Sequence, residues 1–492
     1  MTSYANKRSQ DLGIKNAVRT SNLALKKVPA YRKFLASKTG KAQKPLLKIN
    51  KKDFHTLPVT DKANYLHKYS LNELINDGKV PPMMHTSSGS SGRPTYWFRT
   101  DQQELEGSLQ TEQILKNNFN ISASDKVLFV NCFSMGTWVA GTYMMEVGRI
   151  LSRKSFNIST ICPGIEQEDG VNILRYLPKF FSHVIILGYP PFLTNIFRII
   201  KDRNIKIDGR KLRILTSGDK FSEEWRTEMK RKYSILKSCY ICSIYGSADV
   251  GIMAAETPLS TWLRETFSHS SQLRDFFGVD SRNELPSLFQ YDPNFIYFEE
   301  KKSELLLTTN SGMPLVRYNI KDTGSVFSFG EVEGLLKKSK IYPKVTSLIN
   351  KQLKYPFLVL RGRSDVAILF YAINIFPKYI LDGLKSNPTK NLVTGAYVAF
   401  VADGPKHQEL LIRVELASGV KTTQKSQQTI LESLDKSLQN NSSEYRKLRA
   451  TYGNKVRPRV SLFKLQDQGM FRVGHRSIIQ TVGKKPRMFL GN

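Results

Sequence analysis

The sequence predicts an α/β protein. Its large N-terminal domain is expected to combine doubly wound mixed sheets with a β-rich subdomain, and a small α+β C-terminal domain follows. Three observations predict this class. The chain has 492 residues, more than a single ordinary hydrophobic core accommodates. Between residues 101 and 249, short apolar runs alternate with segments of helical length, which is typical of a parallel sheet. From Phe295 onward the apolar runs are short and closely spaced, which favours antiparallel strands.

The chain up to residue 80 predicts helices with basic faces. Within it, Thr60 or Asp61 could cap a helix that starts next to Lys62. An apolar, strand-like stretch then enters a loop rich in serine and glycine, and a second such stretch leaves it. The strands expected around and after this loop are 81–87, 95–100, 126–133, 183–190, 212–219 and 238–246.

The β-rich part is expected to end near Leu360–Asp365, where we place the boundary between a domain of residues 1–362 and a domain of residues 363–492. The short strands expected before this boundary are 296–300, 303–310, 316–320 and 325–330. The elements expected after it are a strand, a helix at 375–385, strands at 396–402 and 409–416, a polar helix at 424–439 and a basic end.

The composition is that of a globular, core-forming protein, with 40% hydrophobic and 11% aromatic residues. No uncharged apolar run reaches the roughly 18 residues of a membrane span, and the best candidate, Val184–Phe197, contains two prolines. The N-terminus lacks the apolar core of a signal peptide, and four cysteines in this length do not make a disulfide framework. The sequence therefore predicts a cytoplasmic protein without a membrane span.

The chain is strongly basic, with 74 Lys and Arg against 42 Asp and Glu and a formal net charge of +32. Such an excess attracts polyanions such as nucleic acid, anionic membranes, nucleotides or an acidic carrier protein. The basic residues are scattered in short pairs such as Lys26-Lys27 and Lys51-Lys52, and no long basic tail or nucleic-acid motif appears. A solvated basic surface is the favoured interpretation, and no specific nucleic-acid site is predicted.

The serine- and glycine-rich loop, HTSSGSSGRPT, has Ser87–Pro94 at its centre. Glycines let the backbone turn tightly and approach a phosphate, while N–H groups and hydroxyls supply donors. Arg93 adds a positive charge suited to a polyphosphate. The G-K-S/T ending of a Walker loop is absent, and the residues alone leave a flexible loop and a phosphate site equally open. The candidate phosphate-binding residues are Ser87, Ser88, Gly89, Ser90, Ser91, Gly92 and Arg93.

This loop resembles the phosphate-binding loop of the adenylate-forming superfamily of acyl- and aryl-CoA ligases. The form S-S-G-S-S-G-R-P-T is most similar to the phenylacetate–CoA ligase branch, which usually has lysine where this chain has Arg93. The resemblance implies ATP-dependent activation of a carboxylic acid as an acyl-adenylate, with Mg²⁺ on the phosphates. Leu215–Arg226 resembles the glycine turn and polar helix that follow in the family, with Asp219 in place of the common glutamate.

The next segment, Cys242–Gly251, resembles the Tyr-Gly-x-x-Glu motif of the family. The resemblance implies that Tyr245 packs its ring on adenine and that Gly246 and Ser247 belong to the same nucleotide site. Asp249 occupies the acidic position, which would hold Mg²⁺. Aspartate keeps the charge of glutamate but is shorter by one methylene, so Mg²⁺ would have to sit closer or bind through water.

Two later segments resemble the ribose site and the interdomain hinge of the family. Pro314–Gly324 resembles the Arg-Tyr-x-x-x-Asp segment, whose aspartate, here Asp322, accepts hydrogen bonds from both ribose hydroxyls. Leu360–Asp365 resembles the hinge, which implies that Arg363 reaches the nucleotide and that Asp365 is the pivot.

The C-terminal domain carries the remaining points of resemblance. Tyr371–Pro377 resembles a loop that lines the thiol channel, with Ala372 in place of its glycine, a departure that bears on coenzyme A as the acceptor. VGKKPR resembles the Gly-Lys-x-x-Arg ending, so Lys484 falls on the family's lysine and Lys485 is a register-shifted alternative. A cation there neutralises charge as the carboxylate attacks the α-phosphate. The family's C-terminal domain is mobile, so it could withdraw the lysine afterwards.

Three other patterns leave alternatives open. Phe129–Tyr143 resembles a segment that helps to wall the acyl pocket, and an aryl or apolar acid would then be favoured, although core packing explains these side chains equally well. Cys239-x-x-Cys242 is interpreted as a pair of buried structural thiols, because nothing nearby completes a metal site. His85 could orient a phosphate or the substrate, or end a strand as a satisfied histidine. The candidate acyl-pocket residues are Phe133, Met135 and Trp138.

The sequence thus predicts an ATP-dependent acid–thiol ligase that acts on a small carboxylic acid and uses ATP, Mg²⁺ and, as the expected acceptor, coenzyme A. Lys484, Asp249 and Arg93 are the expected catalytic residues. Alternative acceptors are a carrier-protein thiol, another protein thiol or an amine, and a carrier protein would be acidic to suit the basic surface. An alternative of another class is a degenerate homologue that binds nucleotide or nucleic acid without catalysis.

Overall fold

The chain divides into two units, which we call the large unit (Met1–Thr86 and Tyr96–Ser364) and the small unit (Ser87–Thr95 and Asp365–Asn492). In this computed structural model the described residues are 2–39, 48–87, 95–279, 285–351, 353–363, 368–371, 373–403, 407–465 and 467.

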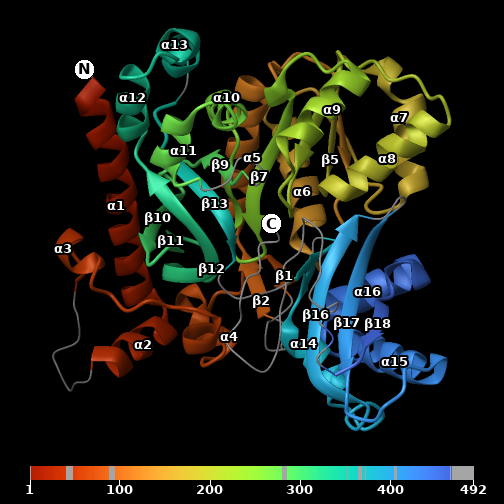
Figure 1. The fold of residues 1–492 in the computed structure, drawn as a ribbon. Coiled ribbons are helices and arrows are strands. Elements are labelled where there is room, and N and C mark those ends of the chain that lie inside the picture. Colours follow the sequence, from red (N-terminus) through yellow and green to blue (C-terminus); the bar gives the residue numbers. More distant parts are fainter. Residues whose placement is uncertain are drawn as a thin grey trace. The chain divides into compact units, whose positions relative to one another are not determined.

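An 11-stranded mixed sheet is the frame of the large unit (Figure 1). In spatial order its strands are β10 (Ile296–Lys301), β11 (Glu304–Thr309), β12 (Leu315–Phe327), β13 (Phe357–Arg363), β9 (Ser287–Gln290), β8 (Gly251–Ala255), β7 (Ile241–Ser247), β6 (Leu212–Thr216), β5 (His183–Gly188), β3 (Val127–Asn131) and β4 (Ile158–Ile161). The strand β7 is the junction, because it runs parallel to β6 and antiparallel to β8.

The two parts of this sheet differ as the sequence predicts. The strands from β4 to β7 are parallel, and all five residues of β3 are buried, as expected for a sheet covered on both faces. The strands from β8 to β10 pair antiparallel. The predicted α/β class, with a doubly wound part and a β-rich part, is therefore confirmed. The two parts share one continuous sheet.

The helices of the large unit flank this sheet. Helix α1 contacts β10, β11 and β12 and runs beside them in Figure 1. The helices are α1 (Thr2–Lys27), α2 (Pro29–Thr39), α3 (Lys51–Phe54), η1 (Lys62–Leu66), α4 (Leu71–Leu74), η2 (Asn76–Gly78), α5 (Asp101–Gln113), η3 (Ile114–Asn118), α6 (Val139–Arg153), α7 (Gln167–Tyr176), η4 (Pro178–Phe180), α8 (Pro190–Asp202), α9 (Glu223–Tyr233), η5 (Ser238–Tyr240), α10 (Pro258–Phe267), α11 (Ser271–Phe277), α12 (Phe329–Lys337) and α13 (Tyr342–Lys351).

The start of η1 and the extent of β12 bear on two local predictions. Asp61 caps η1, because its side chain accepts a hydrogen bond from the Asn64 backbone N–H at 2.7 Å, so the predicted helix start next to Lys62 is confirmed. The two strands expected at 316–320 and 325–330 are wrong in detail, since β12 is continuous from Leu315 to Phe327. It stops there because Ser328 forms a capping box with Glu331 and starts α12.

Ahead of the sheet, β1 (Met83–Ser87) and β2 (Thr95–Arg99) form a two-stranded sheet on either side of the serine- and glycine-rich loop. Both strands lie where the sequence predicts them. A hydrophobic core between the N-terminal helices and the antiparallel strands includes Trp97, whose ring meets that of Tyr318 edge-on at 6.2 Å. This packing ties β2 to β12.

The small unit is built on a three-stranded sheet. In it β16 (Val393–Asp403) pairs antiparallel with β17 (Gln408–Leu416), and β18 (Arg459–Phe463) runs parallel to β17. Buried and half-buried residues alternate along β17, as expected of a strand with one packed face. The remaining elements are β14 (Ile368–Phe370), β15 (Ile373–Ile375), α14 (Pro377–Leu384), α15 (Gln424–Asn441), α16 (Ser443–Tyr452) and η6 (Gly453–Val456).

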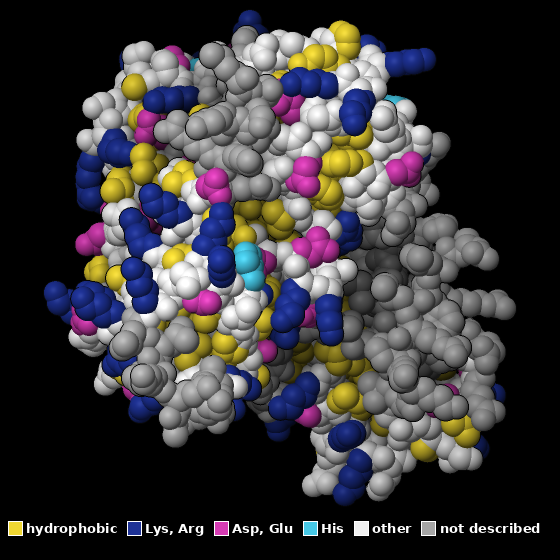
Figure 2. All heavy atoms as spheres, turned by 90° about the vertical axis from the view of Figure 1, so that its left-hand side faces the viewer, with side chains coloured by type: hydrophobic (Ala, Val, Ile, Leu, Met, Phe, Trp, Pro, Cys, Tyr) yellow, Lys and Arg dark blue, Asp and Glu magenta, His cyan; other side chains and the backbone are white. Residues whose placement is uncertain are grey.

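The basic residues are scattered on the face of the protein that Figure 2 shows. Figure 2 shows one face, on which Lys and Arg side chains lie among acidic and hydrophobic ones and do not gather into one continuous patch. Throughout the described ranges, every helix is too short or too polar to cross a bilayer.

Candidate functional site

Three of the predicted nucleotide-binding residues lie together: Tyr245 near the end of β7, Asp322 within β12 and Arg363 at the end of β13. The Tyr245 hydroxyl donates a short hydrogen bond to Asp322 Oδ2. Arg363 stands directly opposite Asp322 in the β12–β13 pair, with its Nη1 atom 3.3 Å from Oδ1. Asp322 and Tyr245 are buried, and burial together with the neighbouring carboxylate raises the pKa of the Tyr245 hydroxyl well above its usual value. The hydroxyl is therefore a neutral donor, and both carboxylate oxygens of Asp322 have partners.

Aromatic packing holds the Tyr245 ring in place. It stacks on Phe289 with ring centroids 5.9 Å apart, and it lies 6.4 Å from the ring of Phe298. Both phenylalanines belong to the antiparallel strands, so the ring is anchored in the core of the large unit. The predicted contact between Tyr245 and adenine stays a prediction.

Asp249 lies in the tight turn between β7 and β8. Gly251, which ends this turn, has φ +99°, a conformation that favours glycine. Asp249 is 6% exposed, and the Tyr318 hydroxyl donates to its Oδ2 atom at 2.7 Å. The ammonium of Lys62 lies 3.6 Å from its other oxygen, Oδ1. The predicted metal ligand thus faces a neutral donor on one side and a cation on the other.

These contacts bear on whether Asp249 suits Mg²⁺. Across the described part of the chain, no group of three or more His, Cys, Asp or Glu side chains is arranged to hold a metal ion. Mg²⁺ commonly takes one or two carboxylates together with phosphate oxygens and water. Asp249 fits such an ion through Oδ1 alone, in competition with Lys62. Nothing in the sequence analysis predicted a role for Lys62, although the helix cap beside it marked the start of η1.

Arg99 is a further residue of this region that the sequence analysis missed. It ends β2, directly after the serine- and glycine-rich loop, and its side chain is fully buried. The Nη2 atom donates to the backbone oxygen of Ala248 at 2.5 Å and lies 3.5 Å from that of Ser247. Arg99 therefore ties β2 to the turn that carries Asp249. An apolar strand pattern such as TYWFRT does not reveal that its arginine points inward.

The predicted acyl-pocket segment lies against β1. The Thr86 backbone N–H donates to the Thr137 oxygen at 3.0 Å. Phe133 is buried, whereas Met135 and Trp138 are half-buried, and Trp138 immediately precedes α6. The structure thus brings this segment next to the strand that enters the serine- and glycine-rich loop. Its role as an acyl pocket stays a prediction.

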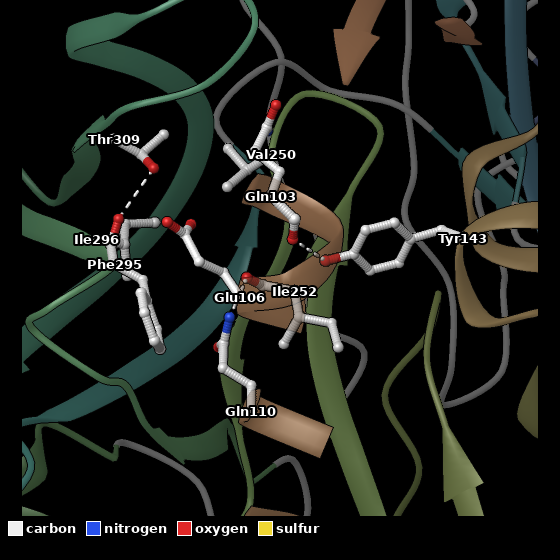
Figure 3. A pocket seen from close by; sticks show the side chains of 9 residues that line it. All are labelled: Gln103, Glu106, Gln110, Tyr143, Val250, Ile252, Phe295, Ile296 and Thr309. Atoms are coloured by element: carbon white, nitrogen blue, oxygen red, sulfur yellow. Dashed lines mark hydrogen bonds between the residues drawn. The ribbon is translucent and has the colours of Figure 1, made fainter. Parts of the chain in front are cut away.

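The weaker sequence patterns have plain structural roles. Cys242 is buried and Cys239 half-buried, and the Asn118 amide donates to Cys242 Sγ at 3.4 Å, which supports the interpretation as structural thiols. A cavity of about 10 Å³ is lined by residues of α5, α6, β8 and β10, and the Tyr143 hydroxyl beside it donates to the Gln103 oxygen at 3.2 Å (Figure 3). That volume holds about one water molecule, too little for a substrate.

Of the remaining predicted residues, some lie at the ends of strands and the others lie outside the described part of the chain. Ser87 ends β1, and Gly246 and Ser247 end β7. The predicted residues outside the described part of the chain are Ser88, Gly89, Ser90, Ser91, Gly92, Arg93, Asp365, Ala372 and Lys484.

Comparison with known proteins shows which solved structures share this fold. No protein-family model and no curated protein matches the chain. A solved structure of 2-hydroxyisobutyryl-CoA ligase, in complex with 2-HIB-AMP and CoA in the thioesterification state, is similar with a TM-score of 0.63 and 15% identity. The likeness covers 95% of this chain and 89% of that one.

Two further structures of that ligase show the same likeness. An open conformation in complex with 2-HIB-AMP and CoA has a TM-score of 0.50 at 14% identity, over 96% of this chain and 91% of that one. A postadenylation state has a TM-score of 0.50 at 14% identity, over 94% and 87%. The chain therefore has the adenylate-forming fold of these CoA ligases.

Proposed function

We propose that this protein activates a carboxylic acid with ATP as an acyl-adenylate and then transfers the acyl group to a thiol, with coenzyme A as the expected acceptor. The observation that carries this proposal is the cluster of Tyr245, Asp322 and Arg363 beside Asp249, set within an adenylate-forming fold. The phenylacetate–CoA ligase-like branch is part of the proposal, as it rests on the form of the serine- and glycine-rich loop.

Asp322 would bind the ribose of ATP. An ionised carboxylate accepts several hydrogen bonds, and Asp322 accepts one from Tyr245 and pairs with Arg363. Ribose hydroxyls would share or take over these positions. Arg363 would then offset the negative charge of the carboxylate beside the ribose.

The first half-reaction is a displacement at the α-phosphorus. A carboxylate oxygen of the acid attacks, a new P–O bond forms, the bond to the pyrophosphate oxygen breaks, and pyrophosphate leaves with its electron pair. No proton transfer is required. The loop Ser87–Pro94, Arg93 above all, would hold the β- and γ-phosphates, and Lys484 would neutralise charge at the α-phosphate. When bound, Mg²⁺ would be held by Asp249 and would neutralise phosphate charge.

The second half-reaction transfers the acyl group. The thiol loses its proton to solvent, and the thiolate attacks the carbonyl carbon of the mixed anhydride. A C–S bond forms, the C–O bond to the phosphate breaks, and AMP leaves with the electron pair of that bond. In this proposal residues 363–492 form a lid that moves about Asp365, so that Lys484 acts in the first step and withdraws before the second. A carrier-protein thiol, another protein thiol or an amine would enter by the same chemistry.

ATP–pyrophosphate exchange with a panel of carboxylic acids tests the proposal. We expect exchange with at least one acid, and a loss of about 100-fold in kcat/KM for ATP in Asp322→Asn, because charged hydrogen bonds to the ribose are weakened. Asp202→Asn, an exposed change at the end of α8, is the matched control and should leave exchange unchanged. ATP binding without exchange for any acid would instead support the non-catalytic homologue.

A further inference from the structure

Two buried side chains near the predicted acyl-pocket segment carry nitrogen atoms that have no hydrogen-bond partner among the described residues. They are Nε and Nη1 of Arg99 and Nε2 of His85. The two residues lie on β2 and β1, the neighbouring strands that flank the serine- and glycine-rich loop. Buried polar atoms are almost always satisfied, so each unsatisfied one calls for a bound partner or a functional reason.

Of the two side chains, Arg99 has the stronger need for a bound partner, because its buried guanidinium is charged. No carboxylate of the described residues comes within ion-pair distance of its guanidinium, and the side chain is fully buried. Burial lowers the pKa of Arg99, although Tyr143, Asp249 and Glu104 act in the opposite direction from further away. A buried cation without a direct counter-ion is strongly destabilising. The bonds from Nη2 to the Asp249 turn account for only one of its three nitrogens.

His85 complements it. The imidazole is 1% exposed, and its Nδ1 atom lies 3.4 Å from Thr142 Oγ1 on α6. Burial first, and then the charge of Arg99, lower the pKa of His85 to about 4, so the ring is neutral near pH 7. It can therefore add a hydrogen bond without adding a second buried charge.

The elements that Arg99 and His85 contact are the ones that would also surround the proposed acid substrate. Thr142 lies on α6, the helix that follows the candidate pocket residues Phe133–Trp138. Arg99 bonds to the turn that carries Asp249, and its guanidinium carbon lies 5.9 Å from the centre of the Tyr143 ring. The unpartnered nitrogens are thus held by the strands, helix and turn that would surround the acid.

We propose that Arg99 and His85 form a subsite for a second anionic group of the acid substrate, so that the preferred substrates are dicarboxylic acids. This inference rests on the proposed function and names its substrate class. Phe133, Met135 and Trp138 then contact the hydrocarbon part, and the guanidinium neutralises the carboxylate that is not activated. A purely apolar acid leaves Arg99 buried without a counter-ion, which is the physical basis for selection against it.

Matched pairs of acids test the subsite in the wild-type protein. Hexanoate against adipate, and phenylacetate against 4-carboxyphenylacetate, differ by one carboxylate at similar length. In ATP–pyrophosphate exchange we expect kcat/KM to be at least about 10-fold higher for the diacid of each pair. Equal or better use of the monoacids would overturn the inference and leave the proposed function standing.

Variants separate binding from a merely structural role. Arg99→Met should lower the ratio of kcat/KM for the diacid to kcat/KM for the monoacid about 100-fold, because any effect through the Asp249 turn is common to both acids. His85→Gln should lower the same ratio less. An equal loss for both acids in Arg99→Met would show that Arg99 only holds the Asp249 turn. The matched control is Arg213→Met. Arg213, on β6, is a buried arginine that donates to the backbone oxygens of Phe119 and Leu212, and its loss should not alter the ratio.

Calorimetry with the diacid alone makes the two proposals separable. Binding of adipate or 4-carboxyphenylacetate that is lost in Arg99→Met, without exchange for any acid, would support the subsite and overturn the proposed function. Exchange with an acid, together with diacid binding that Arg99→Met leaves unchanged, would support the proposed function and overturn the subsite. If Arg99→Met fails to fold, the comparison of matched acids on the wild-type protein still tests the subsite. Arg99→Lys, which keeps the charge, then serves as the variant.

Discussion

At the scale of single residues, His85 links burial to acid stability. Its pKa is lowered from 6.5 to about 4 in the folded chain by burial and by Arg99. Below pH 6.5 the unfolded chain takes up a proton that the folded chain refuses, so acid favours unfolding. The stabilisation from this residue is complete above pH 6.5 and is lost as the pH falls towards 4.

Urea unfolding of wild type and His85→Gln at several pH values measures this effect. Between pH 6.5 and 4 we expect the free energy of unfolding to fall more steeply in wild type, by up to about 1.4 kcal/mol per pH unit. Between pH 7 and 8 the two slopes should agree, which serves as the internal control. Parallel curves across the whole range would mean that His85 is protonated in the folded state.

Single residues of the site differ in whether sequence motifs predict them. Tyr245, Asp322 and Arg363 are predictable because each lies in a segment that resembles a known motif. Arg99 and Lys62 lie in no such pattern, and the contact of each depends on a partner far along the chain. Lys62 meets Asp249, and Arg99 meets Ala248, through folding that no local rule specifies.

At the scale of elements, α5 and α6 approach each other at a glycine. A Cβ atom at Gly107 would lie 2.0 Å from the hydroxyl oxygen of Tyr143 and 2.6 Å from Cζ of its ring. The Tyr143 hydroxyl is fixed by its hydrogen bond to the Gln103 oxygen, so the ring cannot simply turn away. Steric overlap at this site outweighs the gain of about 1 kcal/mol that alanine brings to a helix interior.

Gly107→Ala should therefore lower the free energy of unfolding by about 1–3 kcal/mol. Gly334→Ala is the matched control, since Gly334 lies within α12 and a Cβ there meets nothing within 4 Å. We expect it to raise stability by about 0.5–1 kcal/mol. Urea midpoints of both variants against wild type decide the matter, and a stabilised Gly107→Ala would refute the close packing.

Elements with strong local patterns were predictable, and those set by tertiary context were not. The apolar runs of β3, β5 and β6 stand out because their strands are buried in the sheet. The strands β4 and β9 have only four residues each and give no clear pattern. β18 lies in a segment predicted only as a basic end, and it exists because it pairs in parallel with β17.

At the scale of the whole molecule, the continuous sheet explains why distant residues share one site. Tyr245 lies within β7, the strand at which parallel pairing gives way to antiparallel pairing, and its hydrogen-bond partner Asp322 is 77 residues away along the chain. The order of motifs along the chain predicts that these residues share a function. Only the strand order brings them within hydrogen-bond distance, and the fold class alone does not supply that order.

In the proposed mechanism residues 1–362 bind ATP and the acid, and residues 363–492 form a moving lid that carries Lys484. This arrangement predicts the effect of replacing Lys484. A lysine that neutralises charge only during attack on the α-phosphate affects the first half-reaction alone. Lys484→Ala should lower ATP–pyrophosphate exchange about 100-fold or more. Thioester formation from a supplied acyl-adenylate and coenzyme A should stay within about 3-fold of wild type, because that step does not need this cation.

The chain provides its own control for this experiment, because Lys485 is adjacent, carries the same charge and is the alternative register of the motif. If Lys485→Ala removes exchange while Lys484→Ala does not, the register shifts by one residue and the mechanism stands. Equal losses of both half-reactions in Lys484→Ala would contradict a role confined to adenylation. Unaltered exchange in both variants would mean that adenylation relies on cations of the large unit, with Lys62 beside Asp249 the first to examine.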